Sequence, residues 1–151
     1  MAVMRRMRRL LRPPLAAKGL LVETLVLLAL ARAAVLFLPF RWVARVLGKP
    51  GADVPMQVGP EGIRQARRIG IMVEKVSRHV PWTSKCLDQA LAAKVMLARR
   101  GCATSVRFGV KKNEEGGLAA HAWLKSGRVC VTGGHTRGQF TAINTFTNEG
   151  V

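Results

Sequence analysis

The chain has no tyrosine and few acidic residues, and these shortages exclude some classes of protein. Eight aspartate and glutamate residues stand against 25 lysine and arginine residues in 151, so the formal net charge is +17. Only five phenylalanines and three tryptophans could stack on bases, and no RNP, zinc-finger or helix-turn-helix signature is present. We therefore disfavour nucleic-acid binding. The charge still predicts an acidic partner, such as a protein surface or an anionic lipid.

Cysteine is scarce as well. Three cysteines are too few and odd in number for a fully paired disulfide framework, which favours a reducing compartment, the cytoplasm. No two of them have the spacing of metal ligands, so we expect neither a metal nor another cofactor. Because 49% of the residues are hydrophobic, the chain has enough apolar matter to form a core and is not intrinsically disordered.

A long uninterrupted hydrophobic run is also missing. Residues 19–40 are rich in leucine, but Glu23 and Arg32 leave charge-free runs of only about eight residues, well below the roughly 18 to 20 of a spanning helix. No small-residue cleavage site follows, which argues against a removed signal peptide. We expect a buried or amphipathic helix, with membrane association through residues 19–40 as the alternative. A basic arm precedes it, with arginines at Arg5, Arg6, Arg8, Arg9 and Arg12.

Glycine and proline near residue 50 divide the chain. The sequence Gly48-Lys49-Pro50-Gly51 suggests a boundary, so we expect residues 1–50 to form the basic arm and apolar helix, and residues 51–151 to form one domain. A linker is predicted over residues 49–59.

The second part predicts helices followed by strands. Apolar residues recur at steps of three and four over residues 60–79, which is one face of a helix. Another helix is predicted over residues 85–100, with Ser84 as its N-cap and Gly101 directly after its C-terminus. Beyond Gly101 the period changes to two, and strands are predicted over residues 102–110, 119–125 and 128–132. The fold class is therefore α+β, a helix packed on a small antiparallel sheet and preceded by N-terminal helices; the tail from Gly133 has no clear pattern.

Cys86 is the first candidate for chemistry. It lies in the opening turn of the helix predicted over residues 85–100, where unpaired backbone N–H groups and the positive end of the helix dipole stabilise a thiolate. Packing is the simpler explanation for many cysteines, because a free cysteine behaves as a small hydrophobic residue. This explanation suffices for Cys102 and Cys130, which fall within predicted strands.

A nucleophilic thiol needs a base, and the chain has three histidines. His121 lies on a predicted strand between two alanines, which leave room for another group to approach the imidazole. His79 at a helix end and His135 in a glycine-rich tail are more simply surface residues. A cysteine that starts a helix, followed by a histidine on a later strand, is also the order found in papain-like and transglutaminase-like cysteine hydrolases.

Several motifs in this order carry a more specific resemblance. Cys86-Leu87 opens an alanine- and leucine-rich helix that ends in Ala98-Arg99-Arg100-Gly101, and then come Val106-Arg107-Phe108-Gly109-Val110, Ala120-His121-Ala122-Trp123-Leu124 and Gly127-Arg128-Val129. With these motifs the chain resembles the protease half of the lasso peptide biosynthesis B proteins, a transglutaminase-like family, over roughly residues 20–133. The leucine-rich helix that ends near Leu38-Pro39-Phe40-Arg41 resembles the front of that family.

The resemblance implies a papain/transglutaminase-like fold and a cytoplasmic cysteine protease. Cys86 would attack the scissile carbonyl of a ribosomally made precursor peptide, and His121 would act as general base and then general acid. An ATP-dependent lasso cyclase would then use the released amine of the core peptide. Because 151 residues leave no room for a leader-binding domain, we expect the split form, which works with a separate leader-recognition protein.

The sequence departs from the family pattern at one position. The family usually has an aspartate on the strand after the histidine, whereas Glu149 is the only acidic residue after Trp123. Thr132 or Asn144 could orient the imidazole instead, and the sequence does not choose between them. Asp88 is two residues past Cys86 and would project about 200° away on the helix. The backbone N–H of Cys86 is the natural oxyanion donor.

Two alternatives to a peptidase remain open. The chain could have lost hydrolytic activity and serve as a scaffold of the same pathway. It could also be a membrane-associated transglutaminase-like acyltransferase, in which an amine rather than water resolves the acyl-enzyme. A peripheral membrane contact is compatible with each of these readings.

Overall fold

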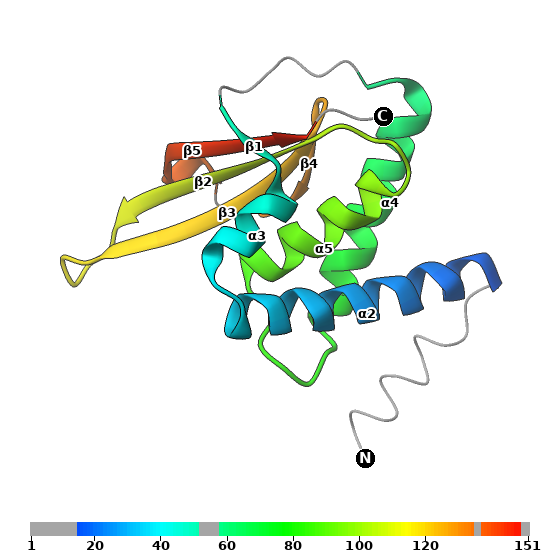
Figure 1. Ribbon diagram of the computed structural model, residues 1–151, viewed down its shortest axis with the longest axis horizontal. Helices are drawn as coiled ribbons and strands as arrows, with labels where there is room; N and C mark the ends of the chain where they lie inside the picture. Colours follow the sequence, from blue (N-terminus) through cyan, green and yellow to red (C-terminus); the bar gives the residue numbers. More distant parts are fainter. Residues whose placement is uncertain (1–14, 52–57, 135–136, 149–151) are drawn as a thin grey trace.

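The computed structural model describes residues 15–51, 58–134 and 137–148, and it has a layer of helices packed on a sheet (Figure 1). The predicted α+β class is confirmed. In chain order the elements are α2 (Leu15–Phe37), α3 (Phe40–Leu47), β1 (Lys49–Pro50), α4 (Pro60–Ser77), α5 (Cys86–Ala98), β2 (Thr104–Lys112), β3 (Leu118–Ser126), β4 (Val129–Thr132), the 3₁₀ turn η1 (Arg137–Gln139) and β5 (Thr141–Asn148).

The sheet has five strands in the order β1-β5-β2-β3-β4, and all of the paired neighbours are antiparallel. The predicted meander of three strands is therefore present as β2, β3 and β4. Two further strands were missed. β5 lies in the unassigned tail and pairs with β2, while β1 lies in the predicted linker and pairs with β5. Cys102 precedes β2, so its predicted place within a strand is wrong; Cys130 does lie on β4.

The helix boundaries differ from the prediction for local reasons. The apolar segment is two helices, because α2 ends before Pro39 and α3 begins directly after it. Lys85, not Ser84, is the N-cap of α5, so the predicted cap is wrong; the Asp88 carboxylate accepts the Lys85 backbone N–H at 2.9 Å. α5 ends at Ala98, and a turn leads to Gly101, whose positive φ of 70° favours glycine.

The centre of the molecule is α5, which packs against α2 on one side and the sheet on the other (Figure 1). Its small residues Ala90 and Ala93 are fully buried and let neighbouring elements approach closely. Leu21 and Leu28 of α2 belong to the same hydrophobic core as Leu124 of β3. Helix α2 is thus part of the core, while the division of the chain at residue 50 stays a prediction.

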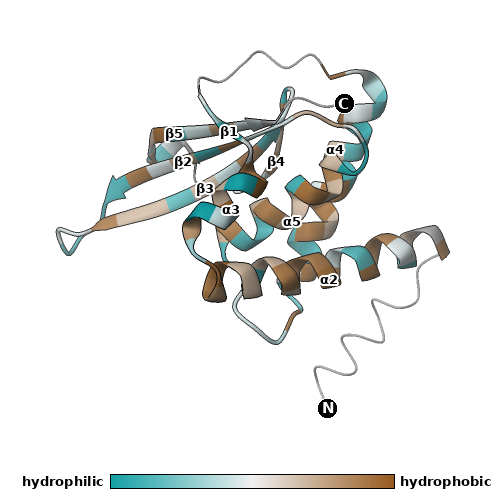
Figure 2. Ribbon diagram, viewed as in Figure 1, coloured by the Kyte–Doolittle hydropathy of each residue, from teal (hydrophilic) through white to brown (hydrophobic). Residues whose placement is uncertain are grey.

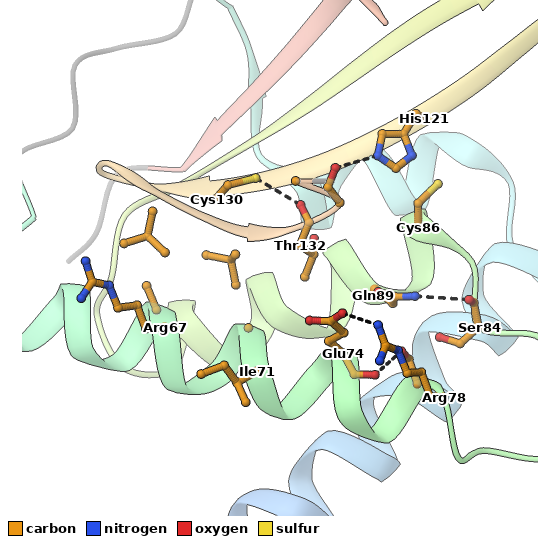
Figure 3. A pocket seen from close by; sticks show the side chains of 17 residues that line it. Arg67, Ile71, Glu74, Arg78, Ser84, Cys86, Gln89, His121, Cys130 and Thr132 are labelled. Atoms are coloured by element: carbon orange, nitrogen blue, oxygen red, sulfur yellow. Dashed lines mark hydrogen bonds and ion pairs between the residues drawn. The ribbon is translucent and has the colours of Figure 1, made fainter. Parts of the chain in front are cut away.

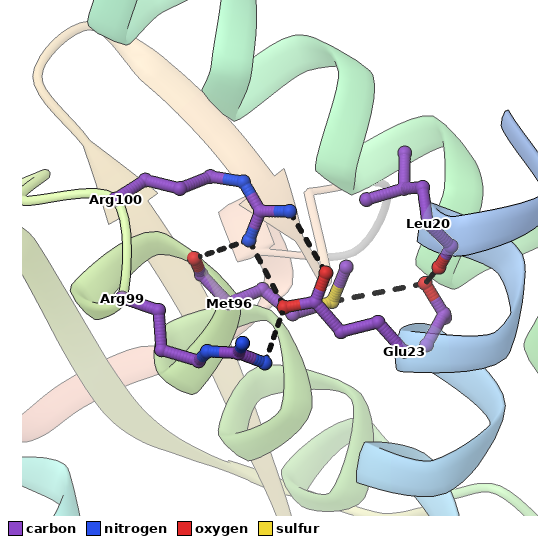
Figure 4. Close-up of polar contacts among 6 residues, drawn as sticks. Leu20, Glu23, Met96, Arg99 and Arg100 are labelled. Atoms are coloured by element: carbon purple, nitrogen blue, oxygen red, sulfur yellow. Dashed lines mark hydrogen bonds and ion pairs between the residues drawn. The ribbon is translucent and has the colours of Figure 1, made fainter. Parts of the chain in front are cut away.

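Ion pairs tie α2 to both ends of α5. Glu23 of α2 accepts hydrogen bonds from Arg99 and Arg100 just after α5, at 2.8 to 3.0 Å (Figure 4). These bonds lower the pKa of the Glu23 carboxyl, with that from Arg100 the largest cause. Near the other end of α5, Arg32 lies 3.5 Å from the fully buried carboxylate of Asp88. The two charges that interrupt the apolar segment therefore face the molecule and fix the position of α2.

Candidate active site

Cys86 is the first residue of α5 and is half-buried. The backbone N–H groups of a first helical turn have no partners within the helix. The chain reaches this helix through a short segment that is held by two contacts: the Asp88 carboxylate accepts the Lys85 N–H, and the Gln89 side-chain amide donates to the Ser84 carbonyl at 3.3 Å. The thiol is therefore presented at a helix N-terminus, as predicted from the sequence, and side chains of α5 hold the two residues that precede it.

His121 lies on β3 and pairs with Gly109 of β2. Its imidazole stacks on the ring of Trp123 at a centroid distance of 5.9 Å and on that of Phe140 at 4.9 Å. Trp123 lies two residues along the same strand and so projects to the same face of the sheet. Gly109 has a role here, since a Cβ at this position would meet both Trp123 and Phe140 at less than 3.0 Å. The aromatic rings restrict the orientation of the imidazole.

The main chain directly after β4 makes a hydrogen bond with the His121 imidazole. The Nε2 atom of His121 lies 2.9 Å from the carbonyl oxygen of Gly133. Because a carbonyl can only accept, Nε2 must donate, and in the neutral ring Nδ1 is then the accepting nitrogen. Gly133 has a φ of 72°, and a Cβ there would lie 2.7 Å from the Ala122 carbonyl oxygen and 3.0 Å from His121 Nε2. Glycine is needed at this position to bring the carbonyl against the imidazole.

Cys86 and His121 line one cleft, of about 560 Å³. Figure 3 shows the Cys86 thiol pointing toward the imidazole at one end of this cleft, which runs between α4 and β4. Gly70 of α4 permits the close approach of these two elements, because a Cβ there would lie 2.6 Å from the Val131 carbonyl oxygen. The structure therefore brings together, in one cleft, the two residues that the sequence singles out.

Apolar residues and a few polar or charged side chains line the rest of the cleft. Arg78 donates to Glu74 across one turn of α4 at 2.7 Å, and Arg67 projects from the same helix (Figure 3). Two hydroxyl oxygens in the cleft wall, Ser84 Oγ and Thr132 Oγ1, are buried and have no hydrogen-bond partner among the described residues. Such unsatisfied buried hydroxyls are uncommon in native structures.

The two candidates for a third catalytic residue lie in different places. Thr132 lies on β4 beside Gly133 and lines the cleft. Asn144 lies on β5, with β2 between it and His121, and its Oδ1 atom accepts the backbone N–H of Thr145 at 2.9 Å. Asn144 is therefore not brought to the imidazole. Asp88 caps α5 and pairs with Arg32, so it is occupied away from the thiol, in agreement with its predicted direction.

The remaining cysteines and histidines differ from the pair in the cleft. Cys102 lies outside the cleft lining, and burial raises the pKa of its thiol, which makes it a poorer nucleophile at neutral pH. Cys130 lines the cleft on β4, between Arg67 and His121 in Figure 3, and its thiol contacts the Thr132 carbonyl oxygen at 3.5 Å. His79 follows α4 and contacts the Lys75 carbonyl oxygen. His135 lies outside the described residues, as do the arginines of the basic arm.

Sequence reasoning missed Gly133, Phe140 and Gln89. A main-chain carbonyl has no side-chain signature, so the role of Gly133 was not readable. Phe140 lies far along the chain in the unassigned tail. Gln89 had a usable signal, because it is three residues after Cys86 and such residues share a helix face. Among residues 15–51, 58–134 and 137–148, no cluster of three histidine, cysteine or acidic side chains could hold a metal ion.

A helix that starts with cysteine, packed on an antiparallel sheet that carries histidine, is the arrangement of the papain-like and transglutaminase-like cysteine hydrolases. Comparison with protein families agrees: residues 29–145 match the family model described as the transglutaminase-like superfamily. The chain belongs to this superfamily, whose members are typically Cys/His hydrolases or transferases. Comparisons with curated proteins and with solved structures give no significant match.

Proposed function

We propose that the chain is a leader peptidase that cleaves the leader from a lasso precursor peptide. The single observation that carries this proposal is the meeting of Cys86 and His121 in an open cleft, with the imidazole held by the Gly133 carbonyl. The superfamily match supports thiol chemistry on an acyl group. The choice of substrate rests on the motifs around Cys86 and His121 that resemble the lasso B proteins.

The geometry supports a two-step reaction. His121 takes the proton of the Cys86 thiol, and the sulfur attacks the scissile carbonyl to form a tetrahedral intermediate. The Cys86 backbone N–H at the start of α5 stabilises the oxyanion. His121 then gives its proton to the leaving amine, which is the N-terminus of the core peptide. Water attacks the remaining thioester, with His121 again as base, and the leader departs with a free carboxylate.

This proposal includes partners. A separate leader-recognition protein would deliver the leader to the cleft, and a lasso cyclase would use the core amine. The cleft is suited to such a substrate, because its wall combines apolar residues with the side chains of Arg67 and Arg78 beside the Cys86 thiol. A peptide that is held elsewhere by its leader would need only a few contacts near the scissile bond.

The proposal is tested by cleavage of the precursor in the presence of the recognition protein, with products identified by mass spectrometry. We expect Cys86→Ala and His121→Ala to lower the cleavage rate by about 1000-fold or more. Cys102→Ala is the matched control, since Cys102 lies outside the cleft, and it should cleave at the parent rate. Cleavage by Cys86→Ala at the parent rate would overturn the proposal.

The same experiment separates the two alternatives. A complex with the precursor and recognition protein that never cleaves would favour a scaffold. A product whose new carboxyl group is joined to an added amine, in preference to water, would favour an acyltransferase.

A further inference from the structure

The outer face of α2 is apolar where a helix on the surface of a soluble protein is usually polar. Val22, Val26 and Leu30 follow one another at steps of four and are 53%, 51% and 59% exposed. The charged residues Glu23 and Arg32 do not interrupt this stripe, because both turn inward and pair with residues at the ends of α5. In Figure 2 most of the α2 ribbon is brown, with a few teal and pale bands between the apolar residues.

The apolar surface continues across α3. Trp42 and Val46 of α3 are about half exposed, and together with Leu30 they border a groove of about 230 Å³ between α2, α3 and α5. Every residue that lines this groove is apolar. We call the whole surface the α2–α3 face and define it by Val22, Val26, Leu30, Phe37, Trp42 and Val46.

A basic side chain borders the α2–α3 face, because the guanidinium of Arg45 lies 4.7 Å above the ring of Trp42. Arg41 and Lys49, on either side of it in the sequence, are exposed as well. Within residues 1–50 the sequence has a single acidic residue, Glu23, against ten basic ones, and Glu23 is bound by Arg99 and Arg100. An apolar surface with a tryptophan and a positively charged border complements the interface of a bilayer that contains anionic lipids.

We propose that the chain docks on an anionic membrane surface through the α2–α3 face, with α2 lying in the plane of the interface. Helix α2 is apolar and long enough to cross a bilayer over Ala17–Phe37, but its other side is built into the core through Leu21 and Leu28. If α2 spanned the membrane, Leu21 and Leu28 would have to leave the core. If α2 lies on the membrane surface, only its exposed side enters the lipid and the core stays intact. This inference goes beyond the proposed peptidase activity and does not depend on it.

Vesicle flotation of the full chain tests the proposal. We expect binding to vesicles of phosphatidylcholine with phosphatidylglycerol, and much weaker binding to phosphatidylcholine alone. The double variant Val26→Glu/Leu30→Glu should lower the partition coefficient by about tenfold or more, since two apolar side chains would no longer enter the interface. Leu118→Glu is the matched control, because Leu118 is 71% exposed at the tip of the β2–β3 hairpin, away from this face, and it should bind like the parent.

Two results would overturn the proposal. One is that the parent and the double variant float equally well with the anionic vesicles, or that neither protein floats with them. The other is a stable dimer in the absence of lipid that Val26→Glu/Leu30→Glu converts to a monomer, which would assign the face to a second copy of the chain. Both altered side chains are exposed, and matching circular dichroism of all variants controls for folding.

Discussion

The imidazole of His121 is held by contacts of different kinds. Trp123 and Phe140 stack on its faces, and the Gly133 carbonyl accepts from Nε2. In papain-like enzymes a side chain orients the histidine, and here a main-chain carbonyl takes that position. A neutral acceptor fixes the tautomer of the ring but adds no negative charge to stabilise the imidazolium.

We predict that Gly133→Ala lowers kcat by about tenfold or more, because the new Cβ would press on His121 Nε2 and the residue would have to hold a positive φ. Asn144→Ala should leave kcat unchanged, since β2 separates it from His121. Thr132→Val should also leave kcat close to the parent value, because the Thr132 hydroxyl is buried and has no hydrogen-bond partner among the described residues. Steady-state kinetics on the precursor measure all three. If Asn144→Ala lost kcat while Gly133→Ala kept the parent kcat, the assignment of the Gly133 carbonyl as the group that orients His121 would be wrong.

A second prediction at this scale concerns Lys94, which lies on α5 with a side chain only 1% exposed. Its Nζ donates to Thr104 Oγ1 at 3.1 Å, and burial lowers its pKa from 10.5 to about 8. Between these two pH values the unfolded state binds more protons than the folded state, so the stability contribution of Lys94 rises with pH, by up to about 3 kcal/mol. Below pH 8 both states are protonated and this contribution is constant.

Lys94→Met should remove this dependence while keeping the length of the side chain. Urea unfolding of the parent and the variant from pH 7 to 10.5 measures the difference in the free energy of unfolding. We expect the advantage of the variant to be largest at pH 7 and to shrink as the pH rises. A constant difference across this range would show that the buried amine does not titrate abnormally.

At the scale of elements, α2 is attached to the rest of the molecule by apolar packing and by the Glu23 pair (Figure 4). We predict that Glu23→Gln lowers the free energy of unfolding by roughly 1 kcal/mol at neutral pH, because two arginines lose a charged partner that is partly exposed. The lowered pKa of Glu23 has a second consequence. Its contribution is present above the ordinary value of 4.5 and is lost as the pH falls through the lower pKa of the folded state.

Thermal unfolding at pH 7 and at pH 3 measures both effects. The parent and Glu23→Gln should differ at pH 7 and converge toward pH 3. Glu114→Gln is the matched control, because Glu114 lies in the exposed turn between β2 and β3. Its unfolding temperature should equal that of the parent at both pH values. An equal deficit of Glu23→Gln at both pH values would contradict the role of the charge.

Which elements could be predicted depended on how local their signals are. α4, α5 and the β2–β3–β4 meander follow from periodicity and from tight turns between neighbours. β5 could not be found in this way, because it is weakly patterned and gains its structure by pairing with β2, more than 30 residues earlier. Cys86 and His121 were readable because a side chain carries their chemistry. The Gly133 carbonyl was not, since its position depends on where the chain turns after β4.

At the scale of the whole molecule, the candidate active site and the proposed membrane-binding surface lie on different elements. The cleft is lined by α4, α5, β3 and the segment around β4, whereas the groove on the α2–α3 face is lined by α2, α3 and other residues of α5, and no residue lines both. The excess of positive charge is compatible with both an anionic membrane and a peptide substrate.

This separation makes a prediction. Val26→Glu/Leu30→Glu should cleave a soluble precursor at the parent rate while losing vesicle binding, because neither residue lines the cleft. Parallel measurement of cleavage and flotation checks it. A matching loss of both properties in a folded variant would mean that the two surfaces are coupled.

The central claim is that His121 activates Cys86, and competitive alkylation with iodoacetamide tests it without any substrate. Peptide mass spectrometry reports the labelling rate of each of the three cysteines in the native chain. We predict that Cys86 is labelled faster than Cys102 and Cys130, and that His121→Ala slows the labelling of Cys86 while it leaves Cys102 unchanged. Faster labelling of Cys102, or a Cys86 rate that does not respond to His121→Ala, would contradict the account.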